Sequence, residues 1–578
     1  MNKSNYYQKP LRLLPINIWD ITALLLILLA VTLLAWGAQQ MAHPFQLGQI
    51  IPISLDPQYL PGYAWQTVLR MLIAMVFSLL FTFTIGTLAA KSKHAAKIIL
   101  PMIDILQSVP VLGFLSLTIA GFIALFPHSL LGPECACIFV IFTAQAWNMT
   151  LGFYQSLLNV PQDLQEAAAM FHLSAWQRFW RVDVPLAMPS LLWNMMMSMS
   201  ASWVFLVASE AISVANQNIT LPGIGSYIAL AIKHADPRAI TYAIITTLIV
   251  IVLYDQILFR PLMAWSQKFR FEQEATNKIK RSWVTFILQR TKFIHYSGKL
   301  FSWLQDVFIN NSWFNPRKLS KHQPHRKHAM TKSLVMMWYT LLVCLIMVAF
   351  VFLLKFIFLT LSLNDAWQVA KFGGATLLRV MATIFISAIV WVPIGVWIGL
   401  RPRVANFIQP IIQFLAAFPA NLLFPIMIFF IMRYQLNVQV WVTLLMISGS
   451  QWYILFNIIA GTSTLPSDYH YAAANLGVKG WLWWKRLVLP AIFPYFITGA
   501  ITAAGAAWNL SIIAEVITWG DKTLVAYGLG AYIAKYTMQG DFHRIALGIT
   551  VMCIFVLVFN YLVWQPLYKM AEKRFAMN

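Results

Sequence analysis

The chain has 578 residues, of which 60% are hydrophobic and only 10% are charged. This composition excludes a soluble globule, because too few polar residues remain to cover its surface. The formal net charge of +22 would suit a nucleic-acid-binding protein, but residues 261–332 alone hold 14 Lys or Arg and three acids, a net +11. A single basic tract is typical of a loop beside an anionic cytoplasmic leaflet. We therefore expect membrane lipid, and no nucleic acid, as a partner.

Apolar runs of about 20 residues predict helices, because backbone groups inside a bilayer must pair within their own segment. The expected fold class is all-α integral membrane. Six candidate spans occupy the first half, at 18–36, 65–90, 98–126, 134–158, 189–214 and 240–263. Clusters of Lys and Arg at 3–12, 91–97, 178–181 and 260–270 fall on one side of these spans. Both ends of this half are therefore expected to be cytoplasmic, with the first span a membrane anchor and not a removed signal peptide.

The pattern restarts after the basic tract, with spans at 334–358, 376–400, 408–432, 438–460, 494–517 and 545–564. Thr67 and Arg70 recur 309 positions later as Thr376 and Arg379, and from Trp147 onward the offset becomes 305. The repeat predicts two tandem six-helix transmembrane domains, 1–263 and 334–578, with about 12 membrane helices in all. A pseudo-two-fold axis along the membrane normal would relate them. A pathway between the halves is the natural site of function; a duplicated scaffold without a pore is the alternative.

The linker between the halves, 264–333, is basic and cytoplasmic in this scheme. Apolar residues at helical spacing between Ile279 and Phe308 predict two short amphipathic helices on the membrane surface, although a solvated tether explains the same composition. Three histidines between 322 and 328 lie among five cations, which would repel a metal ion. All four cysteines lie in apolar segments, where a thiol is usually a packing residue. We expect no disulfide and no metal site.

Two polar islands interrupt the apolar pattern, at 161–189 and 466–494. The first contains QEAAAMFHLSAWQRFWRVDVPLAMP and the second contains HYAAANLGVKGWLWWKRLVLPAIFP. Each has a helix-forming start, a basic middle and a proline exit, where the helix is expected to stop before the next span. An ordinary cytoplasmic loop would explain one island. Two copies at matched positions favour a surface that a second protein grips.

At these residues the sequence resembles the EAA loop of ABC importer permeases of the type I fold. His172 stands in the glycine place of the first copy, and Tyr471 stands in the glutamate place of the second. The resemblance implies that each island docks into a nucleotide-binding ATPase through a short coupling helix, around 173–179 and 478–484. It assigns this coupling to Glu166, Ala167, Ala168, His172, Arg181 and Pro185, and to Ala472, Ala473, Gly477, Arg486 and Pro490. Arg181 and Arg486 are expected to meet acidic groups of the ATPase.

The segments after the islands resemble the fifth helix of the nitrate/sulfonate/taurine permease group, in a fused and duplicated form. Leu221-Pro222-Gly223-Ile224-Gly225 is similar to the Gly-rich stretch of that group. The chain contains no G-x-x-x-x-G-K-[ST] phosphate loop, so we expect a transport component and not an enzyme. No cofactor is expected on this chain, because ATP and Mg would be used by the partner.

The resemblance implies an inner-membrane permease that works with two ATPase copies and a periplasmic substrate-binding protein. The implied substrate is a small anion such as nitrate, sulfonate, taurine or bicarbonate. An ion-gradient-driven transporter or channel is the first alternative, and a membrane scaffold without transport is the second. Transport that persisted without ATP would favour the first of these.

Four polar residues are candidates for the translocation path: Ser209, Glu210, Asn509 and Glu515. The two glutamates occupy equivalent positions and should face inward, because an ionisable group in lipid costs a few kcal/mol. They would serve as gate hydrogen-bonders or, as we favour, as structural carboxylates capped by a neighbouring backbone or Trp N–H.

Arg70 and Arg379 would attract an anion from the outer face or, as we favour, extend to the lipid headgroups. Glu134 and Asp104 have no acidic counterpart in the other half. The sequence therefore assigns them no role.

Overall fold

The computed structural model describes residues 51–269 and 332–575 except 109, 215, 216, 464, 466 and 521, with isolated helical residues at 28–41 and 303–310. The chain forms two compact units. The small unit comprises Met1–Gln39, Val160–Leu192 and Tyr254–Leu319, and the large unit comprises Gln40–Asn159, Trp193–Leu253 and Ser320–Asn578.

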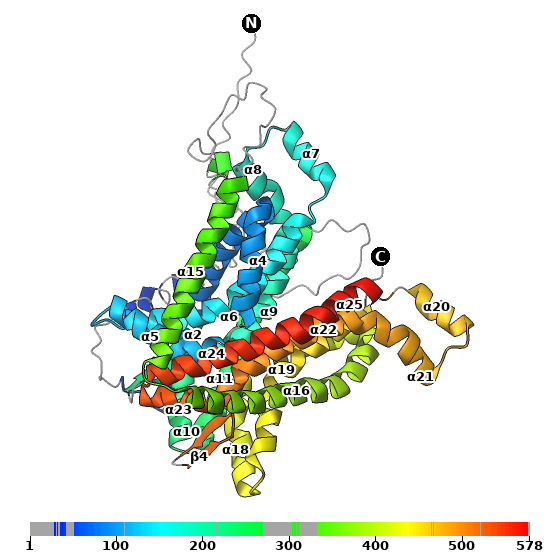
Figure 1. Ribbon diagram of the computed structural model, residues 1–578. Coiled ribbons are helices and arrows are strands. Elements are labelled where there is room, and N and C mark those ends of the chain that lie inside the picture. Colours follow the sequence, from blue (N-terminus) through cyan, green and yellow to red (C-terminus); the bar gives the residue numbers. More distant parts are fainter. Residues whose placement is uncertain are drawn as a thin grey trace, which may run out of the picture. The chain divides into compact units, whose positions relative to one another are not determined.

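The first half is almost entirely helical (Figure 1). Its elements are η1 (Pro57–Tyr59), α2 (Leu60–Phe81), η2 (Thr82–Gly86), α3 (Thr87–Lys91), α4 (Lys93–Ser108), α5 (Val111–Leu125), α6 (Leu131–Leu158), α7 (Gln162–Met170), α8 (Ala175–Arg178), η3 (Phe179–Asp183), α9 (Val184–Glu210), β1 (Ala211–Val214), β2 (Gln217–Thr220), α10 (Ile224–Lys233), α11 (Pro237–Tyr254), η4 (Asp255–Phe259), α12 (Arg260–Ser266) and η5 (Gln267–Phe269).

The second half repeats this order. Its elements are α15 (Lys332–Phe358), α16 (Leu363–Gly399), α17 (Pro402–Ala417), η6 (Ala420–Leu423), α18 (Phe424–Arg433), α19 (Val438–Ser463), α20 (Ser467–Asn475), α21 (Gly480–Trp483), η7 (Trp484–Val488), α22 (Leu489–Ala514), β3 (Val516–Trp519), β4 (Lys522–Val525), α23 (Leu529–Gln539), α24 (Phe542–Phe559), η8 (Asn560–Trp564) and α25 (Gln565–Phe575).

Among the described residues, eight helical stretches are long and apolar enough to cross a membrane, or nine if one bent pair counts as a span. The predicted all-α membrane fold with tandem repeats is confirmed, with two short β-hairpins added. The predicted span at 18–36 lies mostly outside the described residues, and the predicted span at 334–358 is α15.

The third predicted span of each half is wrong as a single helix. In the first half, 98–126 is divided between α4 and α5. In the second half, Pro402–Ala417 and Ala420–Arg433 meet at 76°. Pro110 and Pro419 stand at the breaks with extended backbone, at ψ 106° and 113°. Proline disfavours the helical conformation in the residue before it, so each break follows from local sequence.

The predicted ends of the fifth spans, at 214 and 517, are also wrong. The helices end at Glu210 and Ala514, and the chain turns into the antiparallel pairs β1–β2 and β3–β4. The Glu210 carbonyl oxygen accepts from Leu221 N, and the Glu515 carbonyl oxygen accepts from Ala526 N, both at 2.9 Å. Each glutamate therefore closes the base of its hairpin.

The island prolines do not stop their helices. Ala175–Glu210 and Gly480–Ala514 are continuous helical stretches of 36 and 35 residues. The π-helical segments η3 and η7 end two residues before Pro185 and Pro490. A proline ring clashes with the carbonyl four residues earlier and offers that carbonyl no N–H. The wider π turn relieves this clash, so the chain passes the proline as a helix.

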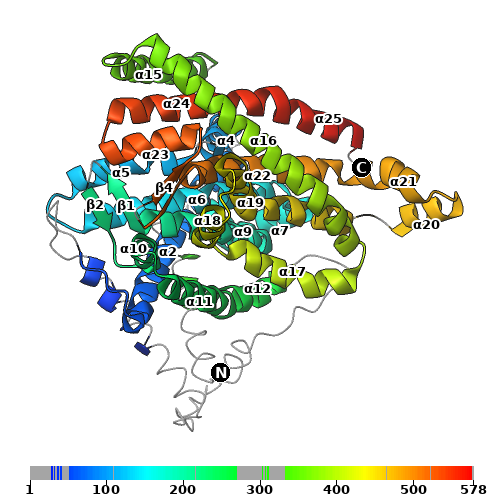
Figure 2. The same cartoon turned by 90° about the horizontal axis from the view of Figure 1, so that it is seen from below.

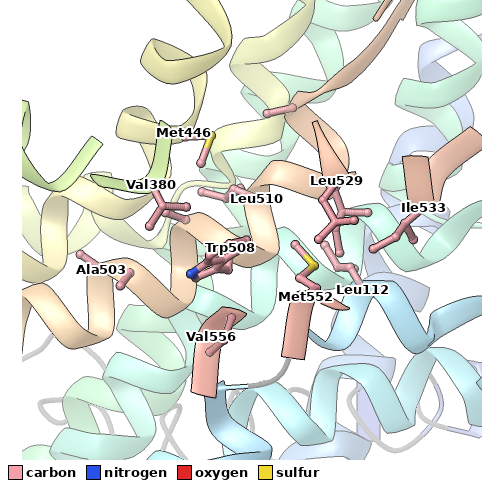
Figure 3. Packing of buried hydrophobic residues seen from close by; sticks show 14 of the residues in the cluster. Leu112, Val380, Met446, Ala503, Trp508, Leu510, Leu529, Ile533, Met552 and Val556 are labelled. Atoms are coloured by element: carbon pink, nitrogen blue, oxygen red, sulfur yellow. The ribbon is translucent and has the colours of Figure 1, made fainter. Parts of the chain in front are cut away.

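The largest buried cluster described in the large unit includes side chains of both halves. Leu112 of α5 belongs to the same buried cluster as Trp508, Leu529 and Met552 of the second half (Figure 3). Lipid supplies little hydrophobic drive between helices, so close packing of small residues matters more. A Cβ on Gly499 of α22 would lie only 3.0 Å from the Tyr453 carbonyl of α19.

The two hairpins connect the halves within the large unit. Each contacts the short helix that follows the other hairpin: β1 lies against α23, and β3 lies against α10. The Gly520 N–H, in the second hairpin, donates to the Ile232 carbonyl oxygen of α10 at 2.9 Å. The hairpins are therefore inter-half contacts as well as helix ends.

Candidate functional site

The first island is a helix, a left-handed turn and a short second helix. After α7 the chain turns at His172, which has φ 49°. His172 N donates to Ala169 O at 3.0 Å, and Leu173 N donates to Ala168 O at 3.1 Å. These two bonds form a Schellman motif, which satisfies carbonyls at the end of α7. Ser174 and Gln177 then form a reciprocal capping box that starts α8.

The second island repeats the same turn. After α20 the chain turns at Gly477, which has φ 67°. Val478 N donates to Ala473 O at 2.9 Å, and Leu476 N donates to Ala472 O at 3.0 Å. The place that holds glycine in the EAA pattern is thus a left-handed position in both islands, and His172 adopts it without glycine's freedom.

This difference between the islands predicts opposite effects of matched substitutions. We expect Gly477→Ala to weaken its turn by about 1–2 kcal/mol, the usual cost of a left-handed L-residue. His172→Gly should strengthen its turn by a comparable amount. A Cβ at Gly477 meets no atom within 4 Å, so the effect is one of backbone alone. Hydrogen exchange at the Val478 and Leu173 amides measures both changes.

His172→Ala is the control, because it keeps a left-handed residue with a Cβ and should leave exchange at Leu173 nearly unchanged. If the rate of hydrogen exchange at the Val478 amide is the same in Gly477→Ala as in the wild type, the left-handed conformation of residue 477 does not control the stability of this turn.

Each island presents a large apolar side chain to its surroundings just before the left-handed turn. Phe171 and Leu476 occupy equivalent positions and are 78% and 79% exposed. Ala168 and Ala473 are buried, while Glu166 and Ala472 are exposed. In both views α20 and α21 extend beyond the end of α22 (Figures 1 and 2).

Arg181 of the first island has an acidic partner within its own chain. Its Nη2 lies 3.2 Å from Asp306 Oδ1, and Gln177 Nε2 donates to Asn310 Oδ1 at 3.0 Å. The linker thus contacts α8 and η3 of the first island inside the small unit. Arg486 of the second island is exposed. The two predicted linker helices otherwise lie outside the described residues.

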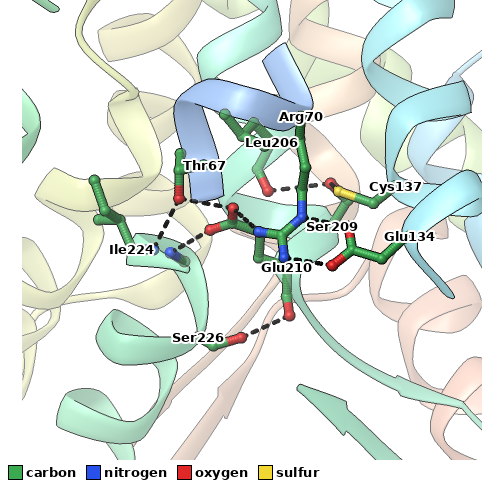
Figure 4. A network of polar contacts seen from close by, with 10 residues as sticks. Thr67, Arg70, Glu134, Cys137, Leu206, Ser209, Glu210, Ile224 and Ser226 are labelled. Atoms are coloured by element: carbon green, nitrogen blue, oxygen red, sulfur yellow. Dashed lines mark hydrogen bonds and ion pairs between the residues drawn. The ribbon is translucent and has the colours of Figure 1, made fainter. Parts of the chain in front are cut away.

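A second candidate site is the buried network around Arg70 (Figure 4). Arg70 donates from Nε and Nη2 to the two carboxylate oxygens of Glu134, at 2.6 and 2.7 Å. Its Nη1 donates to Glu210 Oε1 at 2.6 Å, and all three side chains are buried. Thr67 donates to the same Glu210 oxygen at 2.8 Å. The network joins α2, α6 and α9.

The network continues into α10. Gly225 N donates to Glu210 Oε2 at 2.7 Å, and Ile224 N donates to Thr67 Oγ1 at 3.0 Å. The carboxylate thereby meets the N-terminus of a helix, which favours negative charge. A Cβ on Gly223 would lie 2.4 Å from this carboxylate. The Gly-rich stretch after the hairpin is therefore required for close approach.

The second half builds the same network with one charge fewer. Arg379 Nη1 donates to Glu515 Oε1 at 2.7 Å, and Thr376 donates to the same oxygen at 2.8 Å. Gln439 accepts from Arg379 Nη2 and occupies the place of Glu134, 305 positions earlier. Arg70 thus lies between two carboxylates, whereas Arg379 pairs with one carboxylate and one neutral amide.

Our interpretation of both arginines from sequence was wrong. They do not extend to headgroups, because each side chain points into the bundle toward a buried glutamate. Glu210 and Glu515 are buried and accept hydrogen bonds from Arg, Thr and backbone N–H groups, with no Trp donor among the residues that the structure describes. Glu134, which the sequence left without a role, is the bidentate partner of Arg70. The 305-residue offset, which pairs it with Gln439, was the available signal.

The other two path candidates also lie inside the protein. Ser209 is buried beside Cys137, with Oγ 3.0 Å from the sulfur, and donates to Leu206 O. Asn509 accepts from Val111 N at 2.9 Å and so joins α22 to the start of α5. Lining of a path by these residues remains a prediction. Among the described residues, no group of three or more His, Cys, Asp or Glu could hold a metal ion.

A doubled helical membrane protein with a matched polar island in each half has the architecture of a transport permease. The chain belongs to the family of binding-protein-dependent transport system inner membrane components, whose model matches residues 82–258 and 391–576. One match falls in each half, which confirms the internal duplication.

Several curated proteins are similar to parts of the chain. The bicarbonate transport system permease protein CmpB of Synechococcus elongatus is 29% identical over 162 residues, 28% of this chain and 57% of CmpB. The nitrate import permease protein NrtB of Leptolyngbya laminosa is 27% identical over 197 residues, 34% of this chain and 66% of NrtB. The chain thus covers less than two thirds of these relatives. A probable ABC transporter permease protein of Brucella abortus is 25% identical over 241 residues, 41% of this chain and 90% of that protein. These matches confirm the resemblance to the anion permease group.

Proposed function

We propose that this chain is the fused membrane-spanning permease of an ATP-driven importer. Two copies of a separate nucleotide-binding ATPase would dock at the two islands, and a periplasmic protein would deliver the substrate. The observation that carries the proposal is the pair of exposed apolar residues, Phe171 and Leu476, each set on the same helix and left-handed turn. A large apolar side chain exposed at the same position of both islands is a candidate anchor for a protein–protein contact.

The helical continuity of each island supports a mechanical role. In the second half, Gly480–Ala514 runs as one helical stretch from the island to the residue before Glu515. At about 1.5 Å per residue, its 35 residues extend about 50 Å. Movement of α21 would therefore reach the Arg379 network without passing through a loop. A rigid connection of this kind suits alternation between inward-open and outward-open states.

The proposed substrate is a small anion, because bicarbonate and nitrate are named for two of the similar permeases. ATP and Mg would be bound by the ATPase, since this chain has no phosphate-binding loop. The proposed location is a bacterial inner membrane with both termini in the cytoplasm. The coupling residues would be those assigned from the EAA pattern.

A charge at each apolar anchor tests the proposal. We expect Phe171→Glu or Leu476→Glu to weaken ATPase association at least about 30-fold, because losing one buried interface anchor costs about 2 kcal/mol or more. The double variant should lose both the ATPase on purification and ATP-dependent anion uptake. Leu363→Glu is the control, because Leu363 is 77% exposed but lies at the start of α16.

Two outcomes contradict the proposal. Isolation from the native membrane without any ATPase would remove its basis. Uptake that survives in the double variant would favour a scaffold or, if it follows an ion gradient, a secondary transporter.

A further inference from the structure

We propose that Arg379 forms a binding site for a small planar oxyanion, which replaces the side-chain amide of Gln439. The guanidinium edge formed by Nε and Nη2 carries the site. In the first half, the equivalent edge of Arg70 holds both oxygens of Glu134, at 2.6 and 2.7 Å. This bidentate pair shows how a two-oxygen anion fits this position of the fold.

The same edge of Arg379 meets neutral groups only. Nη2 donates to Gln439 Oε1 and, at 2.9 Å, to the Tyr527 carbonyl oxygen. Nε has no hydrogen-bond partner among the residues that the structure describes. Gln439 Oε1 also accepts from Tyr527 N at 3.2 Å. The Gln439 Oε1 atom therefore already accepts hydrogen bonds from a guanidinium group and from a backbone N–H. An oxygen of a bound oxyanion would accept from the same two donors.

Gln439 can leave this position without disturbing the fold. Its side chain is exposed, and its backbone N–H is held separately by Asn437 Oδ1 at 2.9 Å. Tyr527 is exposed as well, whereas the Arg379 side chain is only 10% exposed. The Arg379 guanidinium is cationic, so an anion at this edge adds a charge–charge attraction that the neutral Gln439 amide does not supply. An arriving anion would therefore displace the amide.

The first half cannot form the same site. Arg70 is completely buried, and Glu134 holds its Nε and Nη2 edge with a permanent charge. An anion would have to displace a carboxylate from a position without access to water. Gln439 stands in the second half where Glu134 stands in the first. Of the two equivalent arginines, Arg379 can therefore bind an anion and Arg70 cannot.

The position of Arg379 along α16 suits an arriving substrate. Twenty residues separate Arg379 from Gly399, where α16 ends before Arg401 and Arg403. At about 1.5 Å per residue this is about 30 Å, the hydrocarbon thickness of a bilayer. The site therefore lies at the membrane face opposite the two arginines. Its use in import rests on the proposed function, but anion binding does not.

Thermal unfolding of the full chain in detergent tests the site without any ATPase. Sodium nitrate is the probe, with sodium chloride used to hold the ionic strength constant. We expect nitrate to raise the unfolding midpoint of the wild type more than chloride does. Gln439→Glu should rebuild the Glu134 pair and raise the apparent Kd for nitrate at least about tenfold. Gln439→Ala removes the competing amide and should lower that Kd or leave it unchanged.

Glu134→Gln is the matched control, and we expect its nitrate response to equal that of the wild type because Arg70 stays buried. Equal responses of wild type and Gln439→Glu would overturn the site, and so would nitrate acting no differently from chloride. If an ATPase co-purifies while nitrate has no effect, only this inference fails. If nitrate binds and no ATPase co-purifies, only the proposed function fails.

Discussion

Arg70→Met is expected to lower the free energy of unfolding by about 3–5 kcal/mol, the cost of leaving a buried ion pair without its counter-charge. Glu134 and Glu210 would then face each other in the bundle, both buried and with no cation between them. The measurement is the midpoint of thermal unfolding of the purified chain in detergent.

Arg379→Met is the matched control in the other half. We expect a smaller decrease in the free energy of unfolding, because only Glu515 would remain without its cation and the Arg379 side chain is partly accessible to solvent. A triple variant, Arg70→Met with Glu134→Met and Glu210→Gln, should recover most of the stability, since the stranded charges are removed. If Arg70→Met and Arg379→Met lower the free energy of unfolding equally, Arg70 does not stabilise two buried carboxylates, and the assignment of both Glu134 and Glu210 to it is contradicted.

Hydropathy and the internal repeat were enough to predict most of the helices, because a bilayer permits few alternatives. They did not predict which faces of those helices meet. Arg70 and Glu134 are 64 positions apart, and nothing local in the sequence turns one toward the other. The equivalence of Thr67 and Arg70 with Thr376 and Arg379 did indicate a shared structural role. An arginine that reached the lipid headgroups would not require a threonine three residues earlier in both halves.

The hairpins and the π-helical segments were missed for a different reason. Residues 211–214 are apolar enough to extend the preceding span, and their strand conformation depends on pairing with 217–220. Likewise, proline normally ends a helix, and the π turns that carry the chain past Pro185 and Pro490 leave no composition signal. The hairpins depend on pairing between two neighbouring segments, whereas the prediction used properties of single segments. The π turns are a local response to each proline that the simple rule of proline as a helix end does not include.

The two halves share a fold but differ at three matched positions of the islands and the buried network. His172 replaces the glycine of the turn, Lys479 stands where Ser174 caps α8, and Gln439 stands where Glu134 pairs with Arg70. These differences change a turn, a helix cap and a buried charge without altering the helix order. The expected consequence is a permease whose halves contribute unequally to ATPase coupling and to anion binding.

A disulfide between the halves is expected to slow transport strongly and reversibly. A Cβ on Gly520 would lie 3.6 Å from the Cβ of Ala235, which is within the usual range for a disulfide. Ala235 already has φ 50°, so a cysteine there adds no new backbone strain. The pair Ala235→Cys and Gly520→Cys would fasten the second hairpin to the end of α10.

If alternating access requires this contact to open, oxidation of the double variant should reduce ATP-driven anion uptake at least about tenfold, and a reducing agent should restore it. Each single variant, treated with the same oxidant, controls for the four native cysteines and for the strain of a side chain at Gly520, where φ is 57°. Complete cross-linking with uptake at the wild-type rate would mean that the hairpins remain together throughout the cycle. The opening would then have to lie elsewhere between the halves.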